Sequence, residues 1–109
     1  MSDTNDITHG TTNVFADLGY ADATERQTKT RLALRINELL SARKLLQREA
    51  AELLKIGQPK VSELVNYRLD HFSLVRLMGF LTALDQDVEI TIRPRQATKG
   101  IGQISVLAA

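Results

Sequence analysis

Apolar residues recur at helical spacing through the centre of the chain. The first such run places four of them on one helical face, at Leu32, Ile36, Leu39 and Leu40. Asp22 and Glu25 precede this run three residues apart, which is the spacing of an N-terminal capping arrangement. We therefore expect a first helix that begins near Asp22 and ends at residue 42 or 43.

Two short amphipathic segments follow, joined by a tight turn at residues 55–57. The first covers about residues 47–54, and the second covers residues 58–66. A fourth helix is expected after Ser73, which is a good N-cap. Its broad apolar stripe, within residues 74–84, is explained most simply by core packing.

After residue 85 the spacing changes from helical to alternating. Three β-branched residues share one face of the predicted strand, at Val88, Ile90 and Ile92. Pro94 ends this strand, and a second possible strand covers residues 101–107. Two strands alone are marginal in water, so they should pack on the helices or pair with another chain. The expected fold class is mostly α, with four to five helices and a small C-terminal β addition.

Residues 1–21 have no sustained period and many Ser, Asp, Thr, Asn and Gly residues, which indicates a mobile acidic arm. The arm contains an apolar cluster that either folds back on the domain or docks on a partner: Val14, Phe15, Leu18 and Tyr20. The remaining chain divides into a helical domain at residues 22–86 and a C-terminal β segment at residues 87–109.

Composition narrows the class of protein. The 109 residues include no cysteine, which excludes disulfides and thiolate metal sites. The apolar runs are far too short to span a membrane, and the acidic N-terminus does not resemble a secretory signal, so we expect a cytoplasmic protein. The net charge of +1 is uneven: residues 1–25 carry −5 and residues 26–68 carry +6.

The two short helices and their turn have the shape of a helix-turn-helix. Residues 46–64 resemble the XRE-type helix-turn-helix of phage repressors and Cro. The pattern is matched at Gln47, Ala51, Ile56, Gln58, Val61, Ser62 and Leu64. This resemblance implies a lambda-repressor-like domain that binds double-stranded DNA. Residues 13–19, 58–62 and 88–94 also resemble a narrower group, the HigA-like antitoxins.

A recognition helix presents its N-terminal residues to base edges in the major groove. The Gln58 amide can pair with adenine N6 and N7, and Lys60 can reach guanine or a phosphate. Ser62 and Glu63 lie on the exposed side, where Glu63 could accept from cytosine N4. Pro59 belongs to the same face but lacks a side chain that reads bases.

The remaining candidates contact the DNA backbone. Gln47, at the start of the preceding helix, can hold a phosphate with help from the helix dipole. The others are Arg43, Lys44, Arg48, Tyr67 and Arg68. Each has a plainer interpretation as a solvated charge, and Tyr67 as a cap of the recognition helix.

The turn departs from the family pattern at two positions. Lys55 stands where Gly is usual, because a left-handed residue is wanted there. Gly57 replaces the usual Ser as the N-cap of the recognition helix, which is a weaker cap.

Nothing in the chain indicates an enzyme. His9 and His71 are the only histidines, and neither has a metal-ligating partner at a suitable spacing. No phosphate-binding loop or nucleophile motif is present. We expect no cofactor and no metal.

The most consistent interpretation is a repressor that binds a pseudo-palindrome as a homodimer. The predicted strand with Val88, Ile90 and Ile92 is the candidate dimer interface. The HigA-like resemblance implies a second partner, a small RelE-type or HigB-like toxin, bound by the acidic arm. Two alternatives remain open: an autonomous phage-type repressor without a toxin partner, and a helical adaptor that no longer binds DNA.

Overall fold

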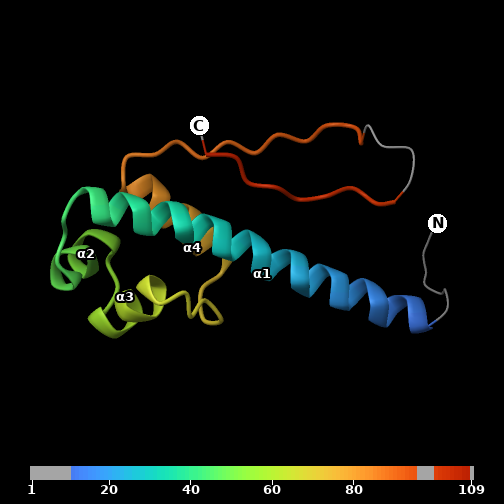
Figure 1. Cartoon of the computed structure of the whole chain (residues 1–109), viewed down its shortest axis with the longest axis horizontal. Coiled ribbons are helices and arrows are strands. Elements are labelled where there is room, and N and C mark those ends of the chain that lie inside the picture. Colours follow the sequence, from blue (N-terminus) through green and yellow to red (C-terminus); the bar gives the residue numbers. More distant parts are fainter. Residues whose placement is uncertain (1–10, 96–99, 109) are drawn as a thin grey trace.

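A computed structural model describes the backbone of residues 11–95 and 100–108, with side chains from Asp22 onwards. Its helices are α1 (Thr11–Ala42), α2 (Gln47–Leu54), α3 (Gln58–Val65) and α4 (Leu74–Ala83). The fold is the predicted one, mostly α with a lambda-repressor-like helix-turn-helix at α2 and α3. Figure 1 shows α1 as the long axis, with α2 and α3 below it and α4 behind it.

Helix α1 is much longer than the sequence pattern predicted. Its 32 residues span about 48 Å at 1.5 Å per residue, close to the 50 Å length of the molecule. It begins at Thr11, so the prediction of a start near Asp22 is wrong. Asp22 pairs instead with Arg26 at 3.3 Å, and Glu25 pairs with Lys29 at 3.3 Å. These are i,i+4 pairs of a helix interior and not a cap.

The second half of the predicted arm, residues 11–21, is therefore helical backbone, while residues 1–10 lie outside the described residues. The apolar cluster offered a helical signal, because positions 14, 15 and 18 are spaced i, i+1 and i+4. Gly19 and the polar residues before position 14 obscured it, since they are weak helix formers. The side chains of Val14, Phe15, Leu18 and Tyr20 lie outside the described residues.

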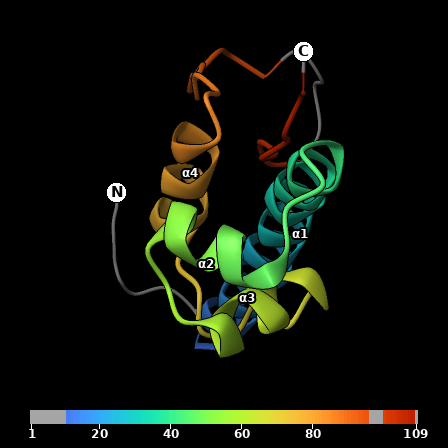
Figure 2. The same cartoon turned by 90° about the vertical axis from the view of Figure 1, so that its left-hand side faces the viewer.

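The core lies between the C-terminal half of α1 and the other three helices. Helix α1 packs on α4 and α3, and α2 packs on α3 and α4 (Figure 2). Ile36, Leu64 and Leu77, from α1, α3 and α4, are among the most completely buried side chains. Within the described side chains of α1, burial begins at Thr28. The N-terminal part of α1 extends past the core (Figure 1).

Every helix is followed by a non-glycine residue in the left-handed region. Lys44 follows α1, Lys55 follows α2, and Tyr67 and Asp85 follow α3 and α4, with φ between 56° and 65°. These residues reverse the chain so that the next amides bond back to the last helical turn. After α3, for example, the Arg68 amide donates to the Glu63 carbonyl at 2.8 Å.

The C-terminal segments are extended, but no strand pairing forms within residues 86–95 and 100–108. Both segments lie on the side of α1 and α4 opposite α2 and α3 (Figures 1 and 2). The predicted inner face is uncovered: Val88 is 36% exposed, Ile90 74% and Ile92 93%. Val106 is half-buried against the core. The β addition expected from the alternating pattern therefore lacks a partner strand in the described part of this chain.

Candidate nucleic-acid interface

The α2–turn–α3 unit has the geometry that its residues predict. Lys55 takes the left-handed conformation expected of the turn, with φ 59° and ψ 45°. Gly57 is the extended N-cap of α3, and no side chain caps that helix. Ala50 and Ala51 are buried in α2, which packs on α3. Small side chains at these two positions let the backbones of α2 and α3 approach closely.

Gln47 and Gln58 occupy equivalent places, because each is the first residue of its helix. Both side chains are exposed. Helix α2 is closed at its start by Glu49, whose Oε1 accepts from the Leu46 amide at 2.8 Å. The start of α3 has no such side-chain cap. Because Pro59 has no N–H and the Lys60 amide donates to the Gly57 carbonyl at 3.0 Å, the Gln58 N–H is the group at this helix start that stays available to an outside acceptor. The exposed side-chain amides of Gln47 and Gln58 thus lie at the N-termini of two adjacent helices.

Helix α3 divides into a buried and an open side. Val61 and Leu64 face the core, whereas Gln58 and Pro59 are exposed. Ser62 is half-buried, and its hydroxyl lies 3.5 Å from the Asn66 Nδ2. The first turn of α3 is therefore the part of this helix that is most open to a base edge.

Two predicted base-reading residues belong to a cluster that the sequence did not indicate, and we call it the Lys60–Glu63–His71 cluster. The Lys60 ammonium lies 3.9 Å from Glu63 Oε1 and 3.5 Å from the His71 carbonyl oxygen. It also sits 5.0 Å from the ring centre of Phe72. Glu63 Oε2 lies 3.9 Å from His71 Nδ1. The cluster joins α3 to the loop before α4.

The predicted phosphate-binding cations fall into two groups. Arg43 donates to the Leu84 carbonyl at 3.0 Å and to Asp85 Oδ2 at 2.8 Å. It therefore connects the end of α1 to the end of α4, a role that no local sequence pattern indicated. Lys44, Arg48 and Arg68 are exposed and form no ion pair within the described residues. The side chains of Lys44, Arg48 and Arg68 are therefore available to bind an anion.

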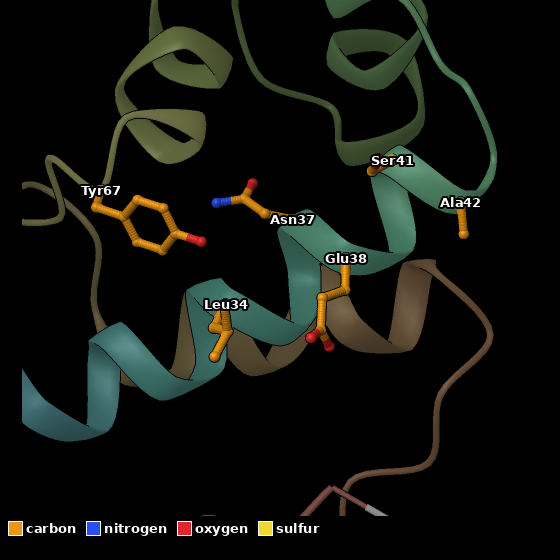
Figure 3. A pocket seen from close by; sticks show the side chains of 6 residues that line it. All are labelled: Leu34, Asn37, Glu38, Ser41, Ala42 and Tyr67. Atoms are coloured by element: carbon orange, nitrogen blue, oxygen red, sulfur yellow. The ribbon is translucent and has the colours of Figure 1, made fainter.

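Tyr67 lies directly after the end of α3 and contacts its last turn. It is the left-handed residue after that helix, and its amide donates to the Leu64 carbonyl at 3.2 Å. Its ring is turned toward α1 across a shallow groove of about 500 Å³ (Figure 3). The Tyr67 side chain is 43% exposed, so its contact with the DNA backbone stays a prediction.

Asn37 was not identified from the sequence, yet it positions the recognition helix. Its Nδ2 donates to the Leu64 carbonyl at 3.2 Å, which ties α1 to the last turn of α3. The side chain lies in the same groove, between α1 and Tyr67 (Figure 3). Its Oδ1 is buried and has no partner among the described residues. An asparagine inside a long helix carries no local signal for this contact.

The described residues contain no group of three or more metal-ligating side chains. In that same part of the chain, no helix is both long enough and apolar enough to cross a membrane.

Comparisons with known proteins agree with the helix-turn-helix geometry. A family described as "Helix-turn-helix domain" matches residues 14–93. A solved structure of an XRE family transcriptional regulator is 53% identical, over 81% of this chain and 99% of that one, with a TM-score of 0.77. No curated protein matches the chain significantly. The chain therefore belongs to the helix-turn-helix domain family and is an XRE-type helix-turn-helix regulator.

Proposed function

We propose that this protein is a sequence-specific transcriptional repressor that reads the major groove with α3. The observation that carries the proposal is the pair of exposed glutamines, Gln47 and Gln58, at the first positions of α2 and α3. Gln58 reads an adenine through its amide, while Gln47 and the α2 dipole hold a phosphate. Lys44, Arg48 and Arg68 add backbone contacts that fix the register but carry no sequence information.

The repressor acts as a homodimer. One helix-turn-helix module buries too little surface for tight specific binding, so a second copy is needed to read a second half-site. The uncovered face with Val88, Ile90 and Ile92 supplies the contact, because an extended segment with free backbone groups can pair with its symmetry mate. Its location opposite α2 and α3 leaves both of those helices open to DNA.

The same protein is the antitoxin of a toxin–antitoxin pair, with residues 1–21 and the N-terminal part of α1 as the toxin-binding region. The negative charge of residues 1–25 complements a ribonuclease toxin of the RelE or HigB type, whose surface must be basic to hold RNA. A helix that extends past the core also offers its length to a partner. Val14, Phe15, Leu18 and Tyr20 are the proposed apolar anchors.

The DNA-binding proposal is tested by fluorescence anisotropy of the full chain with a duplex from its own upstream region. A scrambled duplex of the same composition is the control, and both are measured at two salt concentrations. A repressor binds its own region at least about 10³-fold more tightly than the scrambled duplex. Equal, salt-sensitive binding to both duplexes leaves only the phosphate interaction and favours the adaptor alternative.

The antitoxin proposal is tested by co-expression with the product of the neighbouring gene. Capture of a basic partner by the full chain, and its loss when residues 1–21 are deleted, supports the proposal. The substitutions Val14→Glu and Leu18→Glu, which place a charge at two apolar anchor positions, should act like the deletion in the full chain. Undiminished capture by the deleted chain contradicts it and favours an autonomous repressor.

A further inference from the structure

We propose that the N-terminal part of α1 docks in a groove between α2 and α4 of a second copy of this chain. The contact is heterologous, because a helix of one copy meets a groove of the next. It can therefore continue beyond a dimer. It requires neither DNA nor a toxin, so it stands or falls independently of the proposed function.

The α2–α4 groove has an apolar floor and a cationic rim. Its volume is about 380 Å³, and it lies between the end of α2 and one side of α4. Leu53, Phe80 and Ala83 supply apolar surface, and Lys55 and Arg76 supply two positive charges. Among the described residues, no acidic side chain lines the groove and neither cation forms an ion pair. The groove therefore suits an apolar segment that carries negative charge.

Gly79 keeps the α2–α4 groove open. It lies in the interior of α4, where glycine is an unfavourable helix former. A Cβ at this position would meet no atom within 4 Å apart from the backbone of its own helix. Packing within the chain therefore does not explain the glycine. A second helix that approaches the α4 backbone closely would explain it, because glycine leaves room for such an approach.

The projecting part of α1 has the matching pattern of residues. Val14, Phe15 and Leu18 each precede a core residue by eighteen positions, which is five helical turns. Their counterparts are all 5% exposed or less: Leu32, Ala33 and Ile36. The apolar stripe of α1 is thus repeated on the part of the helix that extends past the core (Figure 1). Residues 1–25 also carry a charge of −5, opposite in sign to the rim of the groove.

The groove must belong to a second copy, because α1 cannot fold back on its own groove. Helix α1 is continuous over 32 residues, and its C-terminal half packs on α4, so its N-terminal end is held away (Figures 1 and 2). The groove includes no residue of α3 or of the C-terminal extended segments. Docking therefore leaves the recognition helix and the predicted dimer interface open. Copies bound at neighbouring DNA sites then assist each other, since DNA raises their local concentration.

Sedimentation velocity of the full chain over a range of concentrations tests the contact. The wild type should form species larger than a dimer as the concentration rises. Gly79→Glu places a carboxylate in the groove and should weaken this association at least about tenfold. Its fold should be preserved, because glutamate is a better helix former than glycine and the Cβ has room. Val75→Glu is the matched control, with the same charge at a 77% exposed position of α4 outside the groove. It should associate like the wild type.

A mixing experiment distinguishes this contact from any other association. Leu18→Glu alters the helix and leaves the groove intact, whereas Gly79→Glu does the opposite. Each variant alone should form nothing larger than a dimer. Their equimolar mixture should associate again, because one variant supplies the helix and the other supplies the groove.

Three results overturn the inference: a wild type that never exceeds a dimer, a Gly79→Glu protein that associates like the wild type, or a mixture that does not associate. A fourth result assigns the groove to a different occupant and also overturns it. This is capture of the neighbouring gene's product by the wild type but not by Gly79→Glu.

Discussion

At the scale of single residues, the ends of the helices carry backbone strain. Lys44, Lys55, Tyr67 and Asp85 all adopt a left-handed conformation that favours glycine. Each non-glycine residue there is destabilising on the order of 1 kcal/mol, because its Cβ crowds the following carbonyl. Lys55 forms no ion pair with the described residues, whereas Asp85 is held by Arg43.

This difference predicts gains in stability of different size for two glycine substitutions. Lys55→Gly should raise the free energy of unfolding by about 0.5–1 kcal/mol, since it relieves the turn and removes no contact. Asp85→Gly relieves the same strain but loses the 2.8 Å contact with Arg43, so it should gain less. Urea denaturation measures both. A lower stability for Lys55→Gly would contradict this account of the turn.

Local residue roles could be predicted from the sequence where their cause is local. Ser73 was expected as an N-cap, and its hydroxyl accepts from the Arg76 amide at 3.0 Å. Lys55 and Gly57 also have the turn conformations expected of them, because the conformation of a turn depends on neighbouring residues. The role of Arg43 could not be predicted, because its partner lies 42 residues away and depends on how α1 packs against α4.

At the scale of elements, the recognition helix is held by few polar contacts. The Asn37 amide on α1 donates to the Leu64 carbonyl of α3, and the Tyr67 amide donates to the same oxygen. The first contact links two elements, and the second closes the end of α3. The orientation of α3 against α1 therefore depends on apolar packing, with Asn37 as the polar bond that crosses the interface.

Asn37→Ala should lower the free energy of unfolding by about 1 kcal/mol. The cost is that of one hydrogen bond, and it stays modest because the Leu64 carbonyl keeps the Tyr67 amide. Ser41→Ala is the matched control, because Ser41 is exposed on α1 and lines the same groove. Chemical denaturation compares the two. Equal effects would show that the Asn37 contact contributes nothing.

The element boundaries were predictable wherever apolar spacing was strong. Helix α2 was predicted to within a residue, and α3 and α4 to within one or two residues at their ends. The start of α1 was not, since the capping spacing of Asp22 and Glu25 also suits i,i+4 pairing with Arg26 and Lys29 inside a helix. A short sequence window cannot distinguish the two arrangements.

At the scale of the whole molecule, the unpaired C-terminal segments are the feature that the single chain leaves unexplained. Ile90 is 74% exposed and Ile92 is 93% exposed, in backbone with free hydrogen-bonding groups. The alternation of apolar and polar residues predicted the extended conformation. It could not reveal whether the partner strand lies in the same chain. The alternating pattern is satisfied only when a second surface covers it.

A double variant, Ile90→Glu with Ile92→Glu, should make the protein monomeric without unfolding it, because neither side chain packs in the core. Thr91→Glu adds a charge at the intervening position, on the opposite face of the segment, and should leave the dimer intact. Light scattering after size-exclusion chromatography gives the mass of each protein. A dimeric double variant would place the interface elsewhere.

Base reading by Gln58, at the start of α3, is tested most directly by one measurement. The affinities of the wild type and Gln58→Ala are compared on the upstream duplex and on a scrambled duplex. We predict that Gln58→Ala weakens binding to the upstream duplex by about 1–3 kcal/mol, roughly 5- to 150-fold. Binding to the scrambled duplex should stay unchanged, because phosphate contacts supply that affinity. An equal loss on both duplexes, or no loss on either, would contradict base reading by Gln58.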